Sequence, residues 1–210
     1  MATVLANAYK AKNIIWNKMK HLDIGCGNNP RNPYGADDVY GVDIHPGVVD
    51  LGVNFKQANL AVDELPYETN FFDSVSAFDV LEHIPRQAID FQSGELKLPF
   101  INLMSEIWRI LKPNGKLYAL TPAYPSAKAF QDPTHVNFIS QGTHKYFCDE
   151  DAYAKRYGFK GQFQLIEADW MYPSYAGTAH RDWLVRIKNW RKQNIKIGRT
   201  HLVWQLMAEK

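Results

Sequence analysis

The chain is poor in cysteine and contains no long apolar run. Its two cysteines, Cys26 and Cys148, lie far apart in 210 residues, so we expect no disulfide framework and a reducing, cytoplasmic location. No stretch of about 18 apolar residues occurs, so we expect no transmembrane helix. Residues 1–10 lack the charged head and apolar core of a signal peptide, which agrees with a cytoplasmic protein.

No charge of one sign dominates either. The chain has 24 Lys and Arg residues against 22 Asp and Glu residues, a net charge of +2, which neither requires nor excludes a nucleic-acid partner. Apolar residues make up 46% and charged residues 22%, as is usual for a soluble globular protein. The length fits one domain over residues 1–210 with a sizeable core.

A glycine-rich turn follows the first predicted strand, Lys20–Ile24. The strand carries Asp23 near its end, and Gly25 and Gly27 come directly after it. Glycine has no Cβ, so the backbone can turn tightly and a ligand can approach it closely. A second predicted strand ends in Asp43, whose carboxylate can accept hydrogen bonds from both hydroxyls of a ribose. These features alone fit any nucleotide-binding fold.

Three further segments follow in a fixed order. They are Asn59-Leu60 before Glu64-Leu65-Pro66-Tyr67, Phe72-Asp73-Ser74-Val75 before Val80-Leu81-Glu82-His83-Ile84, and Leu111-Lys112-Pro113-Asn114-Gly115-Lys116 before an apolar strand. Together with the glycine turn, the set resembles the class I S-adenosylmethionine-dependent methyltransferases of the type 11 group, over about residues 20 to 170. The resemblance implies a Rossmann-like α/β fold with a mostly parallel sheet of seven strands and one antiparallel edge strand. It also implies S-adenosylmethionine as the cofactor.

The same resemblance assigns residues to the cofactor. Asp23, Gly25 and Gly27 would shape the methionine side, and Asp43 with its neighbour Ile44 would lie at the ribose. Asn59 and Leu60 would border the adenine, and Phe78 would lie beside the cofactor at the end of the fourth strand. The chain departs from the family pattern after Gly27, because Pro30 and Pro33 leave little room for the usual helix. Asn28, Asn29 or Arg31 would then hydrogen-bond to the methionine end instead.

Hydrophobic periodicity predicts the remaining elements. We expect strands at Asp38–Val42, Asn54–Ala58, Phe72–Phe78, Lys116–Thr121, Gln162–Ala168 and His201–Met207, and helices at residues 7–19, Phe100–Leu111, Asp149–Tyr157 and residues 179–194. Residues 1–19 would form an N-terminal cap. Residues 86–99 and 171–198 are longer than the fold needs, and we expect both to be insertions near the substrate.

The sequence favours oxygen methylation over two other reactions. The segment Phe78-Asp79-Val80-Leu81 lacks the prolines typical of enzymes that methylate adenine amino groups, and neither cysteine is well placed as the nucleophile of a pyrimidine C5 methyltransferase. His83 and His135 are candidate bases because imidazole titrates near neutral pH. Asp132, three residues before His135, is expected to orient it. The predicted acceptor is a saccharide or another small polar metabolite.

A divalent metal is an alternative. Asp79, Glu82 and His83, followed by His135, resemble the metal site of small-RNA 2′-O-methyltransferases and of some quinone-precursor O-methyltransferases. Such an ion would grip two adjacent hydroxyls and lower the pKa of one. The competing interpretation is that Leu-Glu-His shapes the pocket without metal, as it does in many relatives of the type 11 group.

A basic segment near the C-terminus leaves the partner open. Residues 181–199 hold seven basic residues and a single acid, interleaved with Trp183 and Trp190. The favoured interpretation is a helix that packs its tryptophans on the sheet and exposes its cations. The alternatives are base stacking with phosphate contact, as in an RNA 2′-O-methyltransferase, and a peripheral membrane helix. A non-catalytic module with a methyltransferase-like fold is a third function, supported by the missing helix after Pro30.

Overall fold

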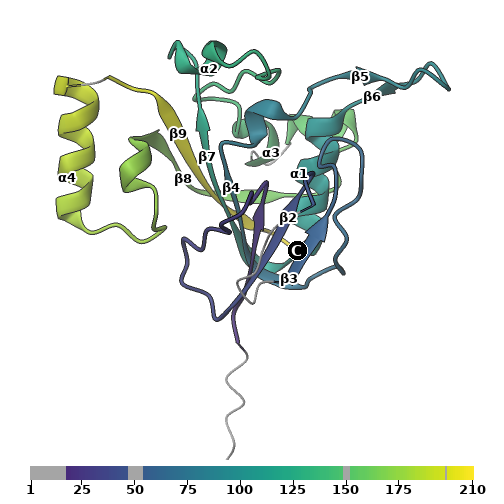
Figure 1. Cartoon of the computed structure of the whole chain (residues 1–210), viewed down its shortest axis with the longest axis horizontal. Helices are drawn as coiled ribbons and strands as arrows, with labels where there is room; N and C mark the ends of the chain where they lie inside the picture. The colour runs from purple at the N-terminus through teal and green to yellow at the C-terminus, as the bar shows by residue number, and fades with distance from the viewer. Residues whose placement is uncertain (1–17, 47–53, 149–151, 197) are drawn as a thin grey trace, which may run out of the picture.

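A seven-stranded sheet forms the centre of the protein (Figure 1). The computed structural model describes residues 18–46, 54–148, 152–196 and 198–210. The strands are β1 (Lys20–Ile24), β2 (Asp38–Asp43), β3 (Asn54–Gln57), β4 (Phe72–Phe78), β7 (Leu111–Pro122), β8 (Phe163–Met171) and β9 (His201–Ala208). Their order is β3-β2-β1-β4-β7-β9-β8.

The predicted sheet is confirmed. Strands β1, β2, β3, β4 and β7 are parallel to one another, and β9 is antiparallel to both β7 and β8. The antiparallel strand therefore lies one place in from the edge, which β8 forms. The carboxyl ends of β1, β2, β4 and β7 meet along one side of the sheet, where open α/β sheets bind ligands.

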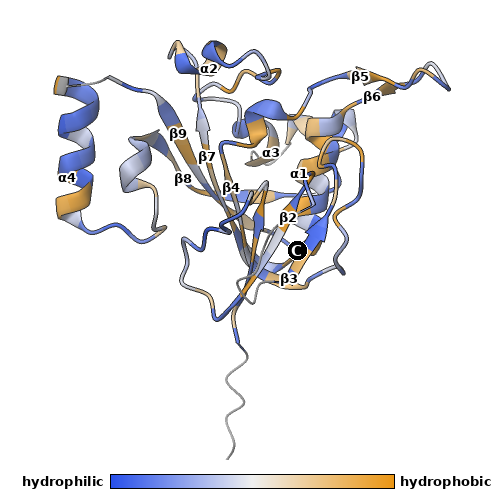
Figure 2. Ribbon diagram, in the orientation of Figure 1, coloured by the Kyte–Doolittle hydropathy of each residue, from blue (hydrophilic) through white to orange (hydrophobic). Residues whose placement is uncertain are grey.

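One face of the sheet packs against helix α1 (Pro99–Ile110). Leu22, Val75 and Leu117 alternate along their strands with residues that face the other way, and all three are fully buried. Met104 and Ile107 of α1 pack in the same core cluster. Proline at the first position of α1 suits a helix start, because its missing N–H is not needed there. Figure 2 shows the apolar central strands that this layer covers.

Loops rather than helices cover the opposite face beside β1 and β2. Residues 25–37 are all described and contain no helix, as the two prolines predict. The loop lies close against β2, because a Cβ at Gly41 would come within 2.7 Å of the Cys26 sulfur and 3.3 Å of Pro30. Glycine at position 41 is therefore what lets the segment after the glycine turn approach β2.

Shorter elements lie outside the seven-stranded sheet. They are the 3-10 helices η1 (Leu81–His83), η2 (Tyr153–Tyr157) and η3 (Pro173–Tyr175), the ribbon β5 (Ala88–Ile89) with β6 (Leu96–Lys97), and the helices α2 (Lys128–Gln131), α3 (Lys145–Cys148) and α4 (Trp183–Arg191), which continues into a π-helical turn, η4 (Lys192–Lys196). The β5–β6 ribbon projects from the body within the predicted insertion 86–99, and α4 stands on the far side of the sheet from α1 (Figure 1). No helix in these described ranges is long and apolar enough to cross a membrane.

Two predicted helices lie partly outside the described residues. The cap helix at residues 7–19 lies almost wholly outside the described residues. The helix predicted at Asp149–Tyr157 is described from residue 152 onward, where it forms only the 3-10 helix η2. Gly158 ends it with φ of 92°, the left-handed conformation that favours glycine at a helix end.

Candidate active site

The glycine turn after β1 has a backbone that requires glycine. Gly25 and Gly27 have φ of 63° and 52°, and the Gly25 N–H donates to the carbonyl of Val42 at 2.7 Å. A Cβ at Gly25 would lie 2.2 Å from a methyl carbon of Val80, so only glycine fits there. A Cβ at Gly27 would meet nothing within 4 Å. The second glycine therefore borders open space.

Asp43 lies beside this turn at the end of β2. Its Oδ2 accepts from the Gly27 N–H at 2.9 Å, and its Oδ1 accepts from the His45 N–H at 3.0 Å. Each carboxylate oxygen has a second lone pair, so both remain able to accept a hydroxyl. The next residue, Ile44, is half exposed at the same strand end. Both residues are predicted cofactor contacts, and the structure places them side by side.

The side chain of Asp23 holds the loop after the glycine turn in place. Its buried carboxylate accepts from the Ser76 hydroxyl at 2.5 Å and from the Arg31 N–H at 2.8 Å. Burial is the main cause that raises the pKa of Asp23 to about 6. The neighbouring His21 ring contacts the hydroxyls of Ser74 and Ser76, and burial lowers its pKa to about 4. These polar groups form a connected network under the turn.

Arg31 takes the place of the missing helix. Its guanidinium donates to the Phe78 carbonyl at 3.1 Å and lies 4.7 Å from the centre of the Phe78 ring. Among the three candidates for the methionine end, Arg31 is thus the one placed at the carboxyl end of β4. An arginine here offers a planar fork of donors that matches a carboxylate.

Asn59 and Leu60 have local structural roles after β3. The Asn59 side-chain oxygen accepts from the Ala61 N–H at 3.0 Å, and its backbone N–H donates to Asp63 at 2.8 Å. Leu60 is buried in the core. Asn59 therefore starts a turn, and its contact with adenine stays a prediction.

Taken together, these residues fit S-adenosylmethionine. The cradle at Gly27 is open, the Asp43 carboxylate can bind two hydroxyls, and the Arg31 guanidinium can bind a carboxylate. All three surround the carboxyl ends of β1, β2 and β4.

A second cluster lies where β4 and β7 end. Possible ligand atoms of Glu82, His83 and His135 lie within 4.8 Å of one another. The two imidazole rings are 4.8 Å apart and nearly perpendicular. The segment after β7 is held against η1, because the N–H groups of Val136 and Asn137 both donate to the Glu82 carbonyl.

Glu82 is the buried member of the cluster. Its Oε2 accepts from the Thr121 hydroxyl at 2.9 Å, whereas its Oε1 has no hydrogen-bond partner among the described residues. Desolvation is the main cause that raises the pKa of Glu82 to about 7. The unpartnered oxygen lies 3.9 Å from Nε2 of His135, too far for a hydrogen bond.

Asp132 has a different neighbour from the one predicted. Its carboxylate accepts from the N–H and hydroxyl of Thr134, and that hydroxyl lies 3.0 Å from Nδ1 of His83. The ring of His135 is held instead by the Ala129 carbonyl, 3.2 Å from its Nδ1. With Nδ1 donating to that carbonyl, Nε2 of His135 remains an acceptor facing Glu82.

Asp79 lies apart from the other three metal candidates. It follows β4 with φ of 55°, and its Oδ1 is 3.6 Å from Nε2 of His201. Burial is the main cause that lowers the pKa of His201. Sequence reasoning missed His201. The signal was available, because the first residue of a final antiparallel strand must lie beside the carboxyl end of β7.

Comparison with known proteins identifies the family. A family model described as a methyltransferase domain matches residues 8–193, most of the chain. The chain belongs to this methyltransferase domain family. Membership implies dependence on S-adenosylmethionine, as the sequence motifs predicted.

A curated relative and several solved structures are similar to this chain. A demethylmenaquinone methyltransferase of Bacillus mycoides (strain KBAB4) is 28% identical over 127 residues, which are 53% of this chain. They are 48% of the relative, so the chain spans about half its length. A chain from the Haloferax volcanii complex between the Trm112 methyltransferase activator and a methyltransferase has a TM-score of 0.54 at 17% identity, covering 92% of this chain and 84% of that one. An S-adenosylmethionine-dependent methyltransferase of Mesorhizobium loti has a TM-score of 0.51 at 15% identity, covering 90% and 91%. These structures show the shared fold.

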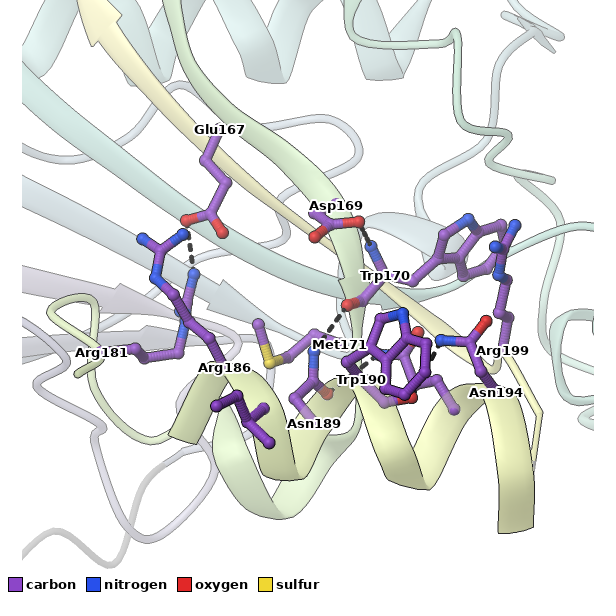
Figure 3. A pocket seen from close by; sticks show the side chains of 12 residues that line it. Glu167, Asp169, Trp170, Met171, Arg181, Arg186, Asn189, Trp190, Asn194 and Arg199 are labelled. Carbon is purple, nitrogen blue, oxygen red and sulfur yellow. Dashed lines mark hydrogen bonds and ion pairs between the residues drawn. The ribbon is translucent and has the colours of Figure 1, made fainter. Parts of the chain in front are cut away.

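Outside this site, the methyltransferase has a cavity of about 410 Å³ between β8 and α4. Figure 3 shows Glu167 and Met171 on β8 and Asn189 and Trp190 on α4 around it. The Arg181 guanidinium binds the Glu167 carboxylate, so this cation of the basic segment is already neutralised.

Helix α4 contradicts the favoured interpretation of the basic segment. Trp183 and Trp190 are 67% and 60% exposed, so they do not pack on the sheet. The inward residues are amides instead: Asn189 accepts from the Tyr172 N–H and donates to the Trp170 carbonyl, and Gln193 donates to Asn189. Hydrogen bonding to the backbone next to β8, rather than apolar burial, thus sets which side of α4 faces inward.

Proposed function

We propose that this protein transfers a methyl group from S-adenosylmethionine to a hydroxyl group of a small acceptor. The observation that carries the proposal is the placement of two sites at the ends of neighbouring strands. The Gly27–Asp43 cradle lies at β1 and β2, and the Glu82–His135 pair lies at β4 and β7. A ligand lying across the strand ends would reach both.

The first site would hold the cofactor. Asp43 would accept the ribose hydroxyls, and Arg31 would bind the methionine carboxylate in place of a helix N-terminus. When bound, S-adenosylmethionine supplies a methyl group on a positively charged sulfur; transfer breaks that S–C bond, leaves its electron pair on sulfur and forms the new bond from the acceptor oxygen to carbon.

The second site would take the proton. Nε2 of His135 is the acceptor we assign to the hydroxyl proton, because its Nδ1 is held by the Ala129 carbonyl. Glu82, whose unpartnered oxygen faces the same nitrogen, would stabilise the imidazolium that forms. Asp132 would act on His83 through Thr134.

The low cysteine content supports a cytoplasmic location, which we include in this proposal. The sequence predicts a saccharide or another small polar metabolite as the source of the hydroxyl. The choice between such an acceptor and a less polar one depends on the walls of the acceptor site.

Calorimetric titration with S-adenosylhomocysteine tests the cofactor site. We expect binding in the wild type and at least tenfold weaker binding in Asp43→Ala, because two charge-assisted hydrogen bonds are lost. Asp38→Ala is the matched control, since Asp38 begins the same strand and its side chain makes a surface ion pair with Lys18. No binding in the wild type would overturn the enzyme proposal and favour the non-catalytic module.

An RNA 2′-O-methyltransferase is the second candidate. Two observations favour it: the Glu82, His83 and His135 ligand atoms cluster within 4.8 Å, and α4 exposes two tryptophans among its cations. Those three residues would hold a divalent ion, which lowers the pKa of a bound hydroxyl. Thermal unfolding with Mn²⁺ or Co²⁺ tests this, with Glu82→Gln as the variant. A metal-dependent rise in the wild type alone, together with binding of short RNA, would support it.

A further inference from the structure

An apolar cavity of about 810 Å³ lies between the start of α1 and the segment that follows β7. Seven of its fourteen lining residues are aromatic, among them Phe100 of α1, Tyr124 and Phe138. In the described part of its lining no residue is acidic, and Arg86 alone carries a charge. A cavity of this size with mostly apolar walls and a few polar groups is typical of a small-molecule site.

Two of the aromatic rings form a flat wall. Phe130 of α2 and Phe138 stack with their centres 4.7 Å apart and their planes inclined by 29°. Both are about half exposed, at 50% and 45%, although an isolated pair of phenylalanines gains by burial. Phe138 is also held in place, because its carbonyl accepts from Arg86. An exposed apolar surface that the backbone fixes in position indicates a ligand that covers it.

Hydrogen bonds and chain neighbours connect the wall of the cavity to the proposed proton acceptor. Arg86 donates to the Asn137 side chain at 2.7 Å, and the Asn137 N–H donates to the Glu82 carbonyl at 2.9 Å. On the other side of the segment, the Ala129 carbonyl that holds His135 directly precedes Phe130. A ligand seated on the Phe130–Phe138 pair would therefore lie close to the segment that holds the Glu82–His135 pair.

From this arrangement we infer that the cavity binds the body of the methyl acceptor, and that the acceptor is a flat aromatic alcohol rather than a saccharide. The inference rests on the proposed function, because the hydroxyl is needed at His135. A saccharide would find too few polar partners on these mostly apolar walls for its many hydroxyl groups, which costs free energy. An aromatic ring gains both burial and stacking there.

The test is binding of 1-naphthol, measured by calorimetry with and without S-adenosylhomocysteine, with methyl glucoside as the polar competitor. We expect naphthol to bind and methyl glucoside not to displace it. Phe138→Ala and Phe130→Ala should each weaken naphthol binding at least tenfold without changing the affinity for S-adenosylhomocysteine. Phe91→Ala is the matched control, because Phe91 is 97% exposed between β5 and β6 and does not line the cavity.

The outcomes separate the two proposals. Binding of S-adenosylhomocysteine without naphthol binding, or naphthol binding unchanged in both cavity variants, would overturn the acceptor class and leave the methyltransferase proposal standing. Displacement of naphthol by methyl glucoside would restore the saccharide. Absence of S-adenosylhomocysteine binding would instead overturn the proposed function. Thermal unfolding of each variant tests whether it remains folded. A lost binding signal in a folded variant then reflects the missing ring.

Discussion

Nε2 of His135 lies 3.9 Å from Oε1 of Glu82, and the Glu82 oxygen has no hydrogen-bond partner among the described residues. An unpartnered buried carboxylate oxygen is costly, since a buried acceptor loses its bonds to water. The gap is too wide for a direct bond and leaves both atoms able to receive a third group. The pair is thus arranged to take up a proton or an ion that arrives with the ligand.

Replacing His135 should slow the chemical step. We expect His135→Ala to lower kcat by about 10²- to 10⁴-fold, the usual contribution of a positioned general base. The affinity for S-adenosylhomocysteine should stay within about twofold, because the ring lies outside the Gly27–Asp43 cradle. Transfer of a labelled methyl group to aromatic alcohols and saccharides measures the first effect. His180→Ala, an exposed histidine beside Tyr34, is the control; an equal loss there would contradict the assignment.

Arg31 should recognise the carboxylate end of the cofactor. We expect Arg31→Gln to weaken S-adenosylhomocysteine binding about tenfold or more, because a charge-assisted pair is lost. Binding of methylthioadenosine, which lacks that carboxylate, should be unchanged. Arg191→Gln on α4 serves as a control for net charge. Equal weakening for both ligands would show that Arg31 only supports the fold around Phe78.

Gly41 should be intolerant of a side chain. Gly41→Ala places a Cβ 2.7 Å from the Cys26 sulfur, so we expect a loss of about 1–3 kcal/mol in the free energy of unfolding and weaker cofactor binding. Gly177→Ala, where nothing lies within 4 Å, should cost far less. Urea denaturation measures both. Adding Cys26→Ala should recover part of the loss; no recovery would mean that Pro30 rather than Cys26 blocks the new methyl group.

The buried His21 and Asp23 should make opposite contributions to acid stability. The folded pKa of His21 is lowered from 6.5 to about 4, so its contribution to stability is full above pH 6.5 and is lost as the pH falls toward 4. The pKa of Asp23 is raised from 3.8 to about 6, so its contribution is full below pH 3.8 and is lost as the pH rises through 6. Between about pH 4 and 6 the two nearly cancel.

Replacing His21 should reveal the pH dependence of stability that Asp23 contributes. Relative to the wild type, His21→Asn should gain up to about 3 kcal/mol in unfolding free energy between pH 6.5 and pH 4, at about 1.4 kcal/mol for each pKa unit. At pH 7 the variant is expected to be less stable, because a ring that contacts two serine hydroxyls is lost. Urea denaturation across this pH range measures the slope. Parallel pH profiles for the wild type and His21→Asn would contradict the pKa shift.

Most of the sheet could be predicted from local patterns. The runs at Lys20–Ile24 and Phe72–Phe78 form strands with the predicted bounds, because polar and apolar residues alternate along both of them, as is typical of a strand. The Gly27–Asp43 contact could be predicted too, since both residues end neighbouring strands. The position of β9 between β7 and β8 depends on pairing across the whole chain.

The second site was harder to predict because its contacts depend on loop conformation. Asp132 is three residues from His135, yet its carboxylate bonds to Thr134 and through it to His83. The orientation of α4 is a further case. Its pattern suggests tryptophans on a buried stripe, but the hydrogen bonds of Asn189 to the backbone at Tyr172 and Trp170 turn the opposite side inward. Periodicity records apolar spacing and does not record such polar anchors.

The outward tryptophans of α4 give the protein two kinds of fluorophore. Trp183 and Trp190 are exposed to solvent, whereas Trp204 in the central sheet is fully buried. Iodide should therefore quench the emission of the first pair and leave that of Trp204 unchanged until the sheet unfolds. The part of the emission that iodide quenches can then report on contacts made by α4, and the unquenched part, which includes the buried Trp170, on the integrity of the core.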